Sequence, residues 1–421
     1  MSSKESQALE GQSLFNYRQK QHYPLNIGDI LHDRYRVLAK LGFGAYSTVW
    51  LSRDERTSKH LCLKVCVNDE TTNSPVLNEA EMLRHLESTS EAGDHPGLDF
   101  IRLADDIFEA DGPTGRHHCI AMKPQGVSVR TLQEFYPDER LPKLLVRSLV
   151  HRLLFAIDWL HSRCQTIHTD ITPLNVLTQA EDDAVFQQIE RQELQDRSGP
   201  TTEGESVAYP SRRASQTLSG IPILTDFGQM RYADPINDSW SMPDTYRAPE
   251  VLLGLPWDYP VDLWSLGMMA EAHNQKQTLE LLEGKNVFDP IDRTHNKYDI
   301  PLALSQYISL LGHPPTSMIE RSQMCFSHFD EEGAWYTCMP SHLTRTRLTE
   351  KHTGHWIWTK EYPIPEESLT DFVTAIPPCM EKDLFLKFVR SMLTWDPDIR
   401  LTANELAEDE WLMMLVEQMA G

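Results

Sequence analysis

The strongest fold signal in this chain is Ile167-His168-Thr169-Asp170-Ile171-Thr172-Pro173-Leu174-Asn175, followed later by Asp226-Phe227-Gly228. The first segment supplies a carboxylate, Asp170, to accept a hydroxyl proton, and an amide, Asn175, to hold a metal ion. The second supplies another metal-holding carboxylate, Asp226. Oxygen ligands of this kind suit Mg²⁺, which takes one or two protein ligands together with phosphates and water. The inventory is typical of phosphoryl transfer, in which catalysis is mostly positioning and charge neutralisation.

A glycine-bearing turn lies upstream, between two expected strands. Alternating apolar residues predict strands over 35–41 and 47–51, and Gly42 and Gly44 stand between them. Glycine lets a backbone approach a polyphosphate closely and adopt positive φ without a Cβ clash. The third glycine of the pattern Gly-x-Gly-x-x-Gly is Ser47 here. Gly-x-Gly turns are also common in ordinary hairpins, so this turn alone does not identify a nucleotide-binding loop.

A lysine and a glutamate follow in the order that an ATP site requires. The third expected strand, 60–65, carries Lys64, which we expect to pair with the α- and β-phosphates. Apolar spacing predicts a helix over 78–86. We expect Glu79 in this helix to pair with Lys64, with Glu81 as the alternative, because a buried lysine without a carboxylate is costly. Taken alone, Lys64 also fits a surface lysine whose stem covers apolar residues.

The second half of the chain has mainly helical spacing. We expect helices over 141–160, 261–272 and 382–393. A small sheet followed by a larger helical block predicts an α+β fold of two lobes, a β-rich N-lobe at 25–123 and a mainly helical C-lobe at 124–418. The cleft between two such lobes is a natural ligand site.

Two segments fall outside this pattern. Residues 1–24 are polar and without period, so we expect a flexible extension. Residues 179–220 include a polar stretch rich in helix breakers, from Asp196 to Glu205, and read as a disordered insertion. A long structureless connection inside a compact domain is usually an inserted segment.

The composition excludes some classes of function. The chain has 421 residues, with 39 Lys and Arg against 62 Asp and Glu and a formal net charge of −23. Nucleic acids and anionic membranes attract basic surfaces, so this charge argues against direct binding to either. It is compatible with cationic partners, although solubility explains it more simply. The seven cysteines are scattered and odd in number, which indicates reduced thiols inside a cell. We expect no signal peptide and no membrane span.

Further motifs complete the series and carry a family resemblance. Ala248-Pro249-Glu250 is followed by Asp262 on an expected helix, where it can brace the loop of Asp170, and Arg400 is a candidate partner of Glu250. The chain resembles eukaryotic protein kinases, and more narrowly the SR-protein kinase family of the CMGC group. The narrower resemblance rests on three stretches, which are His22 to Asp29, Leu41 to Asp54, and His168-Thr169-Asp170-Ile171 in place of the usual His-Arg-Asp.

The resemblance implies a role for each matched position. Asp170 would be the catalytic base, with Lys64, Asn175 and Asp226 as further catalytic residues, and Asn175 and Asp226 would bind Mg²⁺. His168 is expected to be structural, bonding the backbone of the loop. The implied ATP-binding residues are Leu41, Gly42, Gly44, Ser47, Val49, Cys62, Lys64, Glu79, Met122 (the gatekeeper), Lys123 and Gln125 (the hinge).

The resemblance also implies substrates and regulation. It implies ATP-dependent phosphorylation of serine or threonine in basic Arg/Ser-rich proteins such as splicing factors, by a monomer in the cytoplasm and nucleus. Thr169 replaces the arginine that usually binds an activation-loop phosphate, so activity without that switch is expected.

Two departures from the family concern the substrate side. The family has lysine at the position of Thr172, where it contacts the γ-phosphate, and threonine at the position of Pro243. Loss of a cation near the transferring phosphoryl group reduces transition-state stabilisation. A kinase with reduced or redirected activity is favoured, and a pseudokinase scaffold is the alternative. A small-molecule kinase is a third possibility, against which the Ala248-Pro249-Glu250 element and the Asp262 helix argue.

Overall fold

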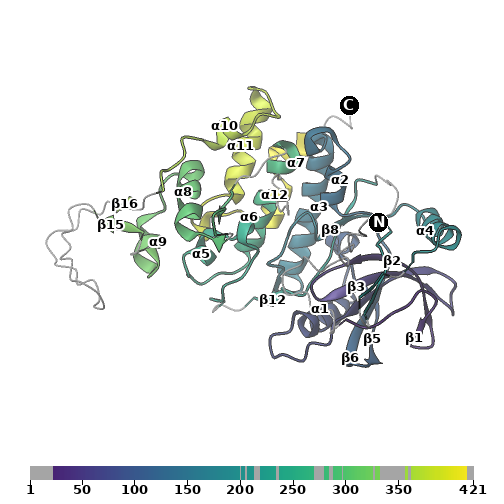
Figure 1. The fold of residues 1–421 in the computed structure, drawn as a ribbon. Coiled ribbons are helices and arrows are strands. Elements are labelled where there is room, and N and C mark those ends of the chain that lie inside the picture. The colour runs from purple at the N-terminus through teal and green to yellow at the C-terminus, as the bar shows by residue number, and fades with distance from the viewer. Residues whose placement is uncertain are drawn as a thin grey trace, which may run out of the picture. The chain divides into compact units, whose positions relative to one another are not determined.

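In the computed structural model, the chain forms two compact units, whose elements are labelled in Figure 1. The first unit contains Met1–Tyr136 and Arg147–Met230, and the second contains Pro137–Val146 and Arg231–Gly421. The described residues are 22–199, 201–203, 206–212, 219–233, 237–269, 279–283, 288–295, 297–325, 328–331, 356–358 and 362–414. All but the last residues of the expected 1–24 extension therefore lie outside the described part of the chain.

The first unit is built on an antiparallel sheet of six strands in the order β1-β2-β3-β4-β6-β5. The strands are β1 (Ile30–Leu31), β2 (Tyr35–Phe43), β3 (Ser47–Asp54), β4 (His60–Cys66), β5 (Ala104–Gly112) and β6 (Gly115–Met122). The three strands predicted over 35–41, 47–51 and 60–65 are confirmed. The register of the β2–β3 pair shifts between Lys40 and Gly42, which places an irregularity in β2 beside the glycine turn.

Helices and short strands complete the first unit. They are α1 (Pro75–Ser90), η2 (Pro96–Phe100), α2 (Val129–Gln133), most of α3 (Lys143–Ser162), β7 (Thr166–Ile167), β8 (Val176–Thr178), α4 (Ala184–Gln195), β9 (Thr201–Glu203), β10 (Ser206–Ala208) and β11 (Pro222–Leu224). Helix α1 begins where Ser74 accepts hydrogen bonds from Val76 N and Leu77 N and Pro75 fixes φ in the first turn. Its buried residues include Ala80, Leu83 and Leu86, which are the residues that predicted the helix.

The second unit is mainly helical. Its elements are η3 (Pro137–Glu139), β12 (Arg231–Tyr232), η4 (Asp244–Tyr246), α5 (Pro249–Leu252), α6 (Pro260–Met268), α7 (Leu279–Glu283), β13 (Ile291–Asp292), β14 (Lys297–Tyr298), α8 (Ile300–Leu311), α9 (Thr316–Arg321), β15 (Phe329–Glu331), β16 (Trp356–Trp358), α10 (Leu369–Phe372), α11 (Met380–Met392), η6 (Pro397–Ile399) and α12 (Ala403–Ala407). The α+β class is confirmed, as are the helices predicted near 141–160 and 382–393. The helix predicted over 261–272 is confirmed up to Met268, and residues 270–272 lie outside the described ranges. No helix within the described ranges is long and apolar enough to cross a bilayer.

The expectation of disorder over 179–220 is wrong for α4, which forms within that segment. Trp50 and Leu51 are consecutive in β3 and therefore point to opposite faces of the sheet, where each joins a different buried cluster. Leu51 is fully buried in a cluster that also contains Phe186 and Ile189 of α4. The amphipathic spacing of these apolar residues, outside the polar stretch that suggested disorder, explains the helix. Residues 200, 204–205 and 213–218 of the segment lie outside the described ranges.

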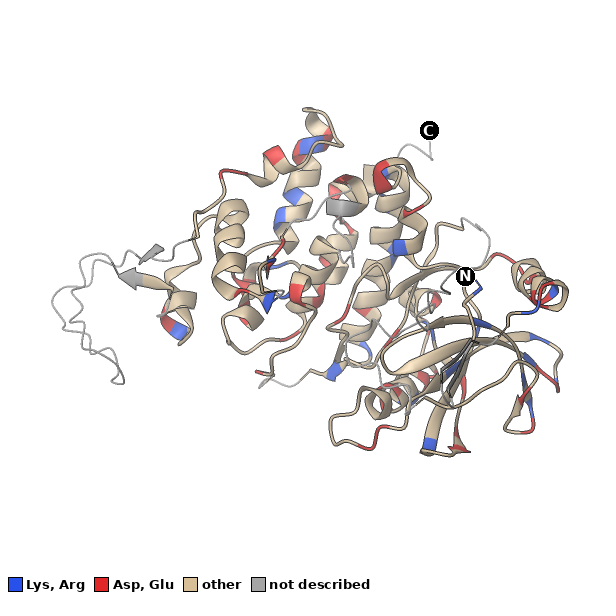
Figure 2. Ribbon diagram, in the orientation of Figure 1, with Lys and Arg blue, Asp and Glu red and all other residues tan. Residues whose placement is uncertain are grey.

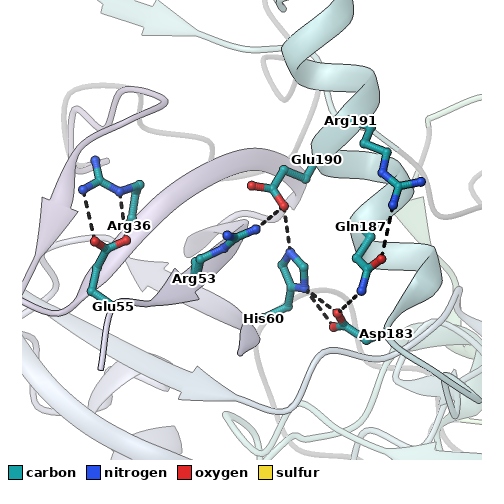
Figure 3. Close-up of polar contacts among 8 residues, drawn as sticks. All are labelled: Arg36, Arg53, Glu55, His60, Asp183, Gln187, Glu190 and Arg191. Atoms are coloured by element: carbon teal, nitrogen blue, oxygen red, sulfur yellow. Dashed lines mark hydrogen bonds and ion pairs between the residues drawn. The ribbon is translucent and has the colours of Figure 1, made fainter. Parts of the chain in front are cut away.

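Polar contacts also join α4, and Asp183 just before it, to the sheet (Figure 3). His60 of β4 lies between two carboxylates, with Nδ1 at 2.8 Å from Asp183 Oδ1 and Nε2 at 3.1 Å from Glu190 Oε2. Arg53 of β3 donates to the same Glu190 carboxylate. Arg36 of β2 pairs with Glu55, the residue after β3, and both side chains are exposed. The inserted helix is therefore held to the sheet by both apolar and charged contacts.

A buried ion pair organises the second unit. Both guanidinium NH₂ groups of Arg400 donate to the two carboxylate oxygens of Glu250, each at 2.6 Å, and both side chains are buried. Arg400 also lies over the ring of Trp264 and donates to the carbonyl of Pro260. This arrangement confirms the predicted pairing and fixes the start of α6, which carries the buried Asp262.

We expect Arg400→Met to destabilise the protein by about 3–5 kcal/mol, because it leaves the Glu250 carboxylate buried without its partner. Lys387→Met is the matched control, because Lys387 and Glu410 are exposed and 3.5 Å apart. The control should change stability by less than about 1 kcal/mol. Denaturant unfolding of both variants measures the difference, and equal midpoints for the two would contradict this account of the pair.

Candidate active site

The centre of the site is a lysine held between two carboxylates of the first unit. Lys64 Nζ of β4 lies 2.6 Å from Glu79 Oε1 of α1 and 3.5 Å from Asp226 Oδ1. Burial disfavours the charge on Lys64, but Asp226 and Glu79 outweigh it and raise the pKa of the lysine. Burial raises the pKa of Glu79, whereas the charge of Lys64 lowers that of Asp226. The pairing of Lys64 with Glu79 is confirmed, and the alternative, Glu81, is exposed.

A two-stranded antiparallel sheet brings the two metal-holding candidates together. β8 pairs antiparallel with β11, so that Val176 lies opposite Leu224. Asn175 precedes the first strand and Asp226 follows the second, and Thr225 N donates to Asn175 O at 2.9 Å. Residues that are far apart in the sequence are therefore placed side by side by ladder hydrogen bonds.

Asp170 and Asn175 close the loop between them. Asn175 Nδ2 donates to both the backbone oxygen and Oδ2 of Asp170, each at 2.9 Å. Because the amide nitrogen is used in this way, Asn175 Oδ1 is the atom left to face a cation. Asp226 adds a carboxylate, and this pairing of an amide oxygen with a carboxylate fits Mg²⁺. The donor set therefore agrees with the metal that the sequence predicts.

His168 holds the loop through contacts with backbone atoms on both sides of its ring. Its Nδ1 accepts from Asp170 N at 3.2 Å, and its Nε2 lies 3.3 Å from Thr225 O. Its ring meets the Phe227 ring edge-on, with centroids 5.5 Å apart. The predicted structural role is confirmed, because both ring nitrogens are engaged with the backbone. His168 thus links the loop of Asp170 to the strand end that precedes Asp226.

A cavity of the first unit gathers many of the predicted residues and adds some that sequence analysis missed. It is lined by Gly44, Ala45, Tyr46, Ser47, Lys64, Cys66, Pro75, Val76, Glu79, Asp170, Asp226, Gly228 and Gln229. The lining residues that were not predicted as site residues are Ala45, Tyr46, Cys66, Pro75, Val76, Gly228 and Gln229. Alternation along β4 places Cys66 on the same face as Lys64, two residues on, so this position was within reach of a sequence argument. Among the lining residues that the structure describes, Lys64 is the basic one.

The remaining predicted ATP-binding residues are not part of this cavity lining. They are Leu41, Gly42, Val49, Cys62, Met122, Lys123 and Gln125. The sheet register places Cys62 of β4 opposite Met122 of β6, and Val49 of β3 opposite Lys64 of β4. Cys62, Met122 and Val49 therefore lie on the same three adjacent strands as Lys64. The Lys123 carbonyl accepts two hydrogen bonds from Arg102, and Gln125 accepts from Ala180 N.

Thr172 and Thr169 define the unusual part of the loop. Thr172 is buried, and its carbonyl accepts from Asn175 N at 3.0 Å, so its backbone shapes the turn that carries Asn175. Thr169 has a φ of 65°, a left-handed conformation that is rare for a β-branched residue. Its hydroxyl donates to Gln229 O at 2.8 Å. Pro243 precedes η4 in the second unit, where its carbonyl accepts from Tyr246 N.

Comparison with known proteins identifies the family. The chain matches the protein kinase domain over residues 35–412. A serine/threonine protein kinase of Aspergillus fumigatus is 31% identical over 395 residues, which cover 93% of this chain and 87% of that protein. The serine/threonine-protein kinase SRPK of Physarum polycephalum is 26% identical, with 96% and 91% covered. The protein kinase dsk1 of Schizosaccharomyces pombe is 26% identical, with 76% and 73% covered. The chain therefore belongs to the protein kinase domain family, and within it is a serine/threonine kinase of the CMGC group similar to the SR-protein kinases.

Proposed function

We propose that this protein kinase transfers the γ-phosphate of ATP to serine or threonine in basic, Arg/Ser-rich proteins. The observation that carries the proposal is the contact of Lys64 with both Glu79 and Asp226. A protein kinase needs this lysine–glutamate pair and the metal-holding Asp in place together. Their arrangement here supports phosphate transfer over a role restricted to binding.

Each residue of the site then has a distinct role. Asp170 accepts the proton of the substrate hydroxyl, and Lys64 holds the phosphates of the nucleotide. Asn175 Oδ1 and the Asp226 carboxylate would hold Mg²⁺, which would supply positive charge to neutralise the phosphates. The Asn175 amide donates to Asp170 Oδ2 at 2.9 Å, so the base and the metal ligand keep a fixed separation. Positioning of this kind accounts for most of the catalysis in phosphoryl transfer.

Two features support a cationic substrate. The chain carries a net charge of −23, and Figure 2 shows acidic and basic residues distributed over elements of both units within the described ranges. A diffuse acidic field attracts cationic chains and accelerates their association. The similarity to a kinase named SRPK points to the same class. We propose splicing factors with Arg/Ser repeats as substrates, a monomeric enzyme, and a location in the cytoplasm and nucleus.

We expect wild-type protein with Mg-ATP to phosphorylate an Arg/Ser-repeat peptide and to act far less on a peptide with alanine for each arginine. Asp170→Asn should abolish transfer because the amide cannot accept the hydroxyl proton. Transfer is measured with labelled ATP. Equal signal from wild type and Asp170→Asn would reject the enzyme and favour a pseudokinase scaffold. Transfer that ignores arginine content would reject the substrate class alone.

A second experiment addresses the missing cation in the catalytic loop. We expect Thr172→Lys to raise kcat by roughly ten- to hundredfold, because it returns a positive charge beside the transferring phosphoryl group. Thr172→Met is the control, with comparable length and no charge. Thermal unfolding of both variants checks that the buried site accepts the longer side chain. A Lys variant that folds but turns over no faster than the Met variant would mean that the missing charge does not limit this enzyme.

The proposed location is tested separately. A fluorescent fusion of the full chain should distribute between cytoplasm and nucleus. The cysteines that the described ranges contain are free thiols, which suits a reducing compartment. Confinement of the fusion to a secretory compartment would contradict the proposal.

A further inference from the structure

Three consecutive backbone carbonyls downstream of Asp226 are held by side chains from two other parts of the first unit. Asn78 Nδ2 of α1 donates to the first and third carbonyls of residues 228–230, both at 3.0 Å. Thr169 Oγ1 donates to the second at 2.8 Å. We call this set of contacts the carbonyl clamp. It ties the segment that carries Asp226 to both α1 and the catalytic loop.

Close packing accompanies the clamp. A Cβ added to Gly228 would lie 3.1 Å from the backbone oxygen of Pro75, which begins α1. Glycine at this position therefore lets the segment and the first turn of the helix approach each other. The approach is close enough for Asn78, one turn into the helix, to reach two carbonyls with one amide group.

The clamp holds backbone that is strained. Asp226 has a φ of 67° and Thr169 a φ of 65°, both in the left-handed region that favours glycine. Such conformations cost free energy and persist where the surrounding structure fixes them. The clamp joins one strained residue, Thr169, to the segment that immediately follows the other. Loss of its hydrogen bonds would let the Asp226 segment relax toward ordinary backbone angles.

We propose that Asn78 is a positioning residue that couples α1 to the metal-holding Asp226. Asn78 and Glu79 are neighbours in one turn of α1, and Glu79 binds Lys64 at 2.6 Å. The same turn thus sets the position of the phosphate-binding lysine through Glu79 and of the metal-holding carboxylate through Asn78. The inference rests on the proposed function, because it assigns Asp226 to Mg²⁺. An asparagine is required, because the two bonds need an NH₂ donor that aspartate lacks.

The test uses two substitutions with the same chemical change. Asn78→Asp replaces the donor by a carboxylate that faces two carbonyl oxygens, and Asn73→Asp makes the change at an exposed residue just before α1. We expect Asn78→Asp to raise the Mg²⁺ concentration for half-maximal phosphate transfer at least about tenfold, because two hydrogen bonds are lost. Asn73→Asp should leave it unchanged. Equal Mg²⁺ dependence in the two variants would overturn the proposal.

Hydrogen exchange provides a readout that does not depend on activity. In the protein without nucleotide, Asn78→Asp should accelerate amide exchange over residues 226–232, and Asn73→Asp should not. Thr169→Val, which removes the hydroxyl at constant shape, should do the same, whereas Thr169→Ser should retain slow exchange. Unchanged exchange in both Asn78→Asp and Thr169→Val would overturn the clamp. If wild type transfers no phosphate, the proposed function fails while the exchange result still decides the clamp.

Discussion

The nucleotide side of the site depends on the burial of Lys64 between two carboxylates. Lys64 extends from the sheet, Glu79 from α1, and Asp226 from the turn that follows β11, so three separate elements meet at one ammonium group. Removing a lysine from water is costly unless opposite charges surround it. Each element is therefore kept in place by the electrostatic requirement of the others. A shift of α1 would leave Lys64 without its nearest carboxylate, and this links the position of the helix to the competence of the site.

Local sequence predicted three of the strands that surround Lys64 and the helix that carries Glu79, but not strands β1, β5 and β6. Strands β2 to β4 follow from apolar alternation, and α1 follows from the spacing of Ala80, Leu83 and Leu86, although the cap at Ser74 starts the helix three residues before the predicted residue 78. Glu79 lies one turn before Leu83 on the buried side of α1, which favoured it over the exposed Glu81. Asn78 was not predicted, because its role depends on two carbonyls about 150 residues away in the chain. A polar residue in the first turn of a helix has many possible partners, and the sequence does not say which tertiary contact forms.

In the insertion after the catalytic loop, the sequence predicted disorder where the structure has a helix, α4. The breaker-rich stretch of the insertion dominated the sequence signal, and the short amphipathic run from Val185 to Ile189 was overlooked. A helix of this length is marginal in isolation, since most helical stability comes from tertiary packing of an apolar face. Here that packing is supplied by Leu51, with His60 and Arg53 adding polar contacts. The surface that stabilises α4 belongs to strands more than 100 residues earlier, so composition alone gave no sign of it.

The two halves of the catalytic loop differ in the contacts that their residues make. On the nucleotide side, a hydrogen bond joins Asn175 to Asp170, and the β8–β11 pairing brings Asn175 near the strand end that precedes Asp226. On the substrate side, Thr172 contributes its backbone carbonyl to the turn while its side chain brings no charge. The hydrogen bond from Asn175 N to the Thr172 carbonyl can form with any side chain at position 172, so the loop keeps its shape with threonine in place of lysine. The turn that carries Asn175 is therefore held by a backbone hydrogen bond that does not depend on the side chain at position 172.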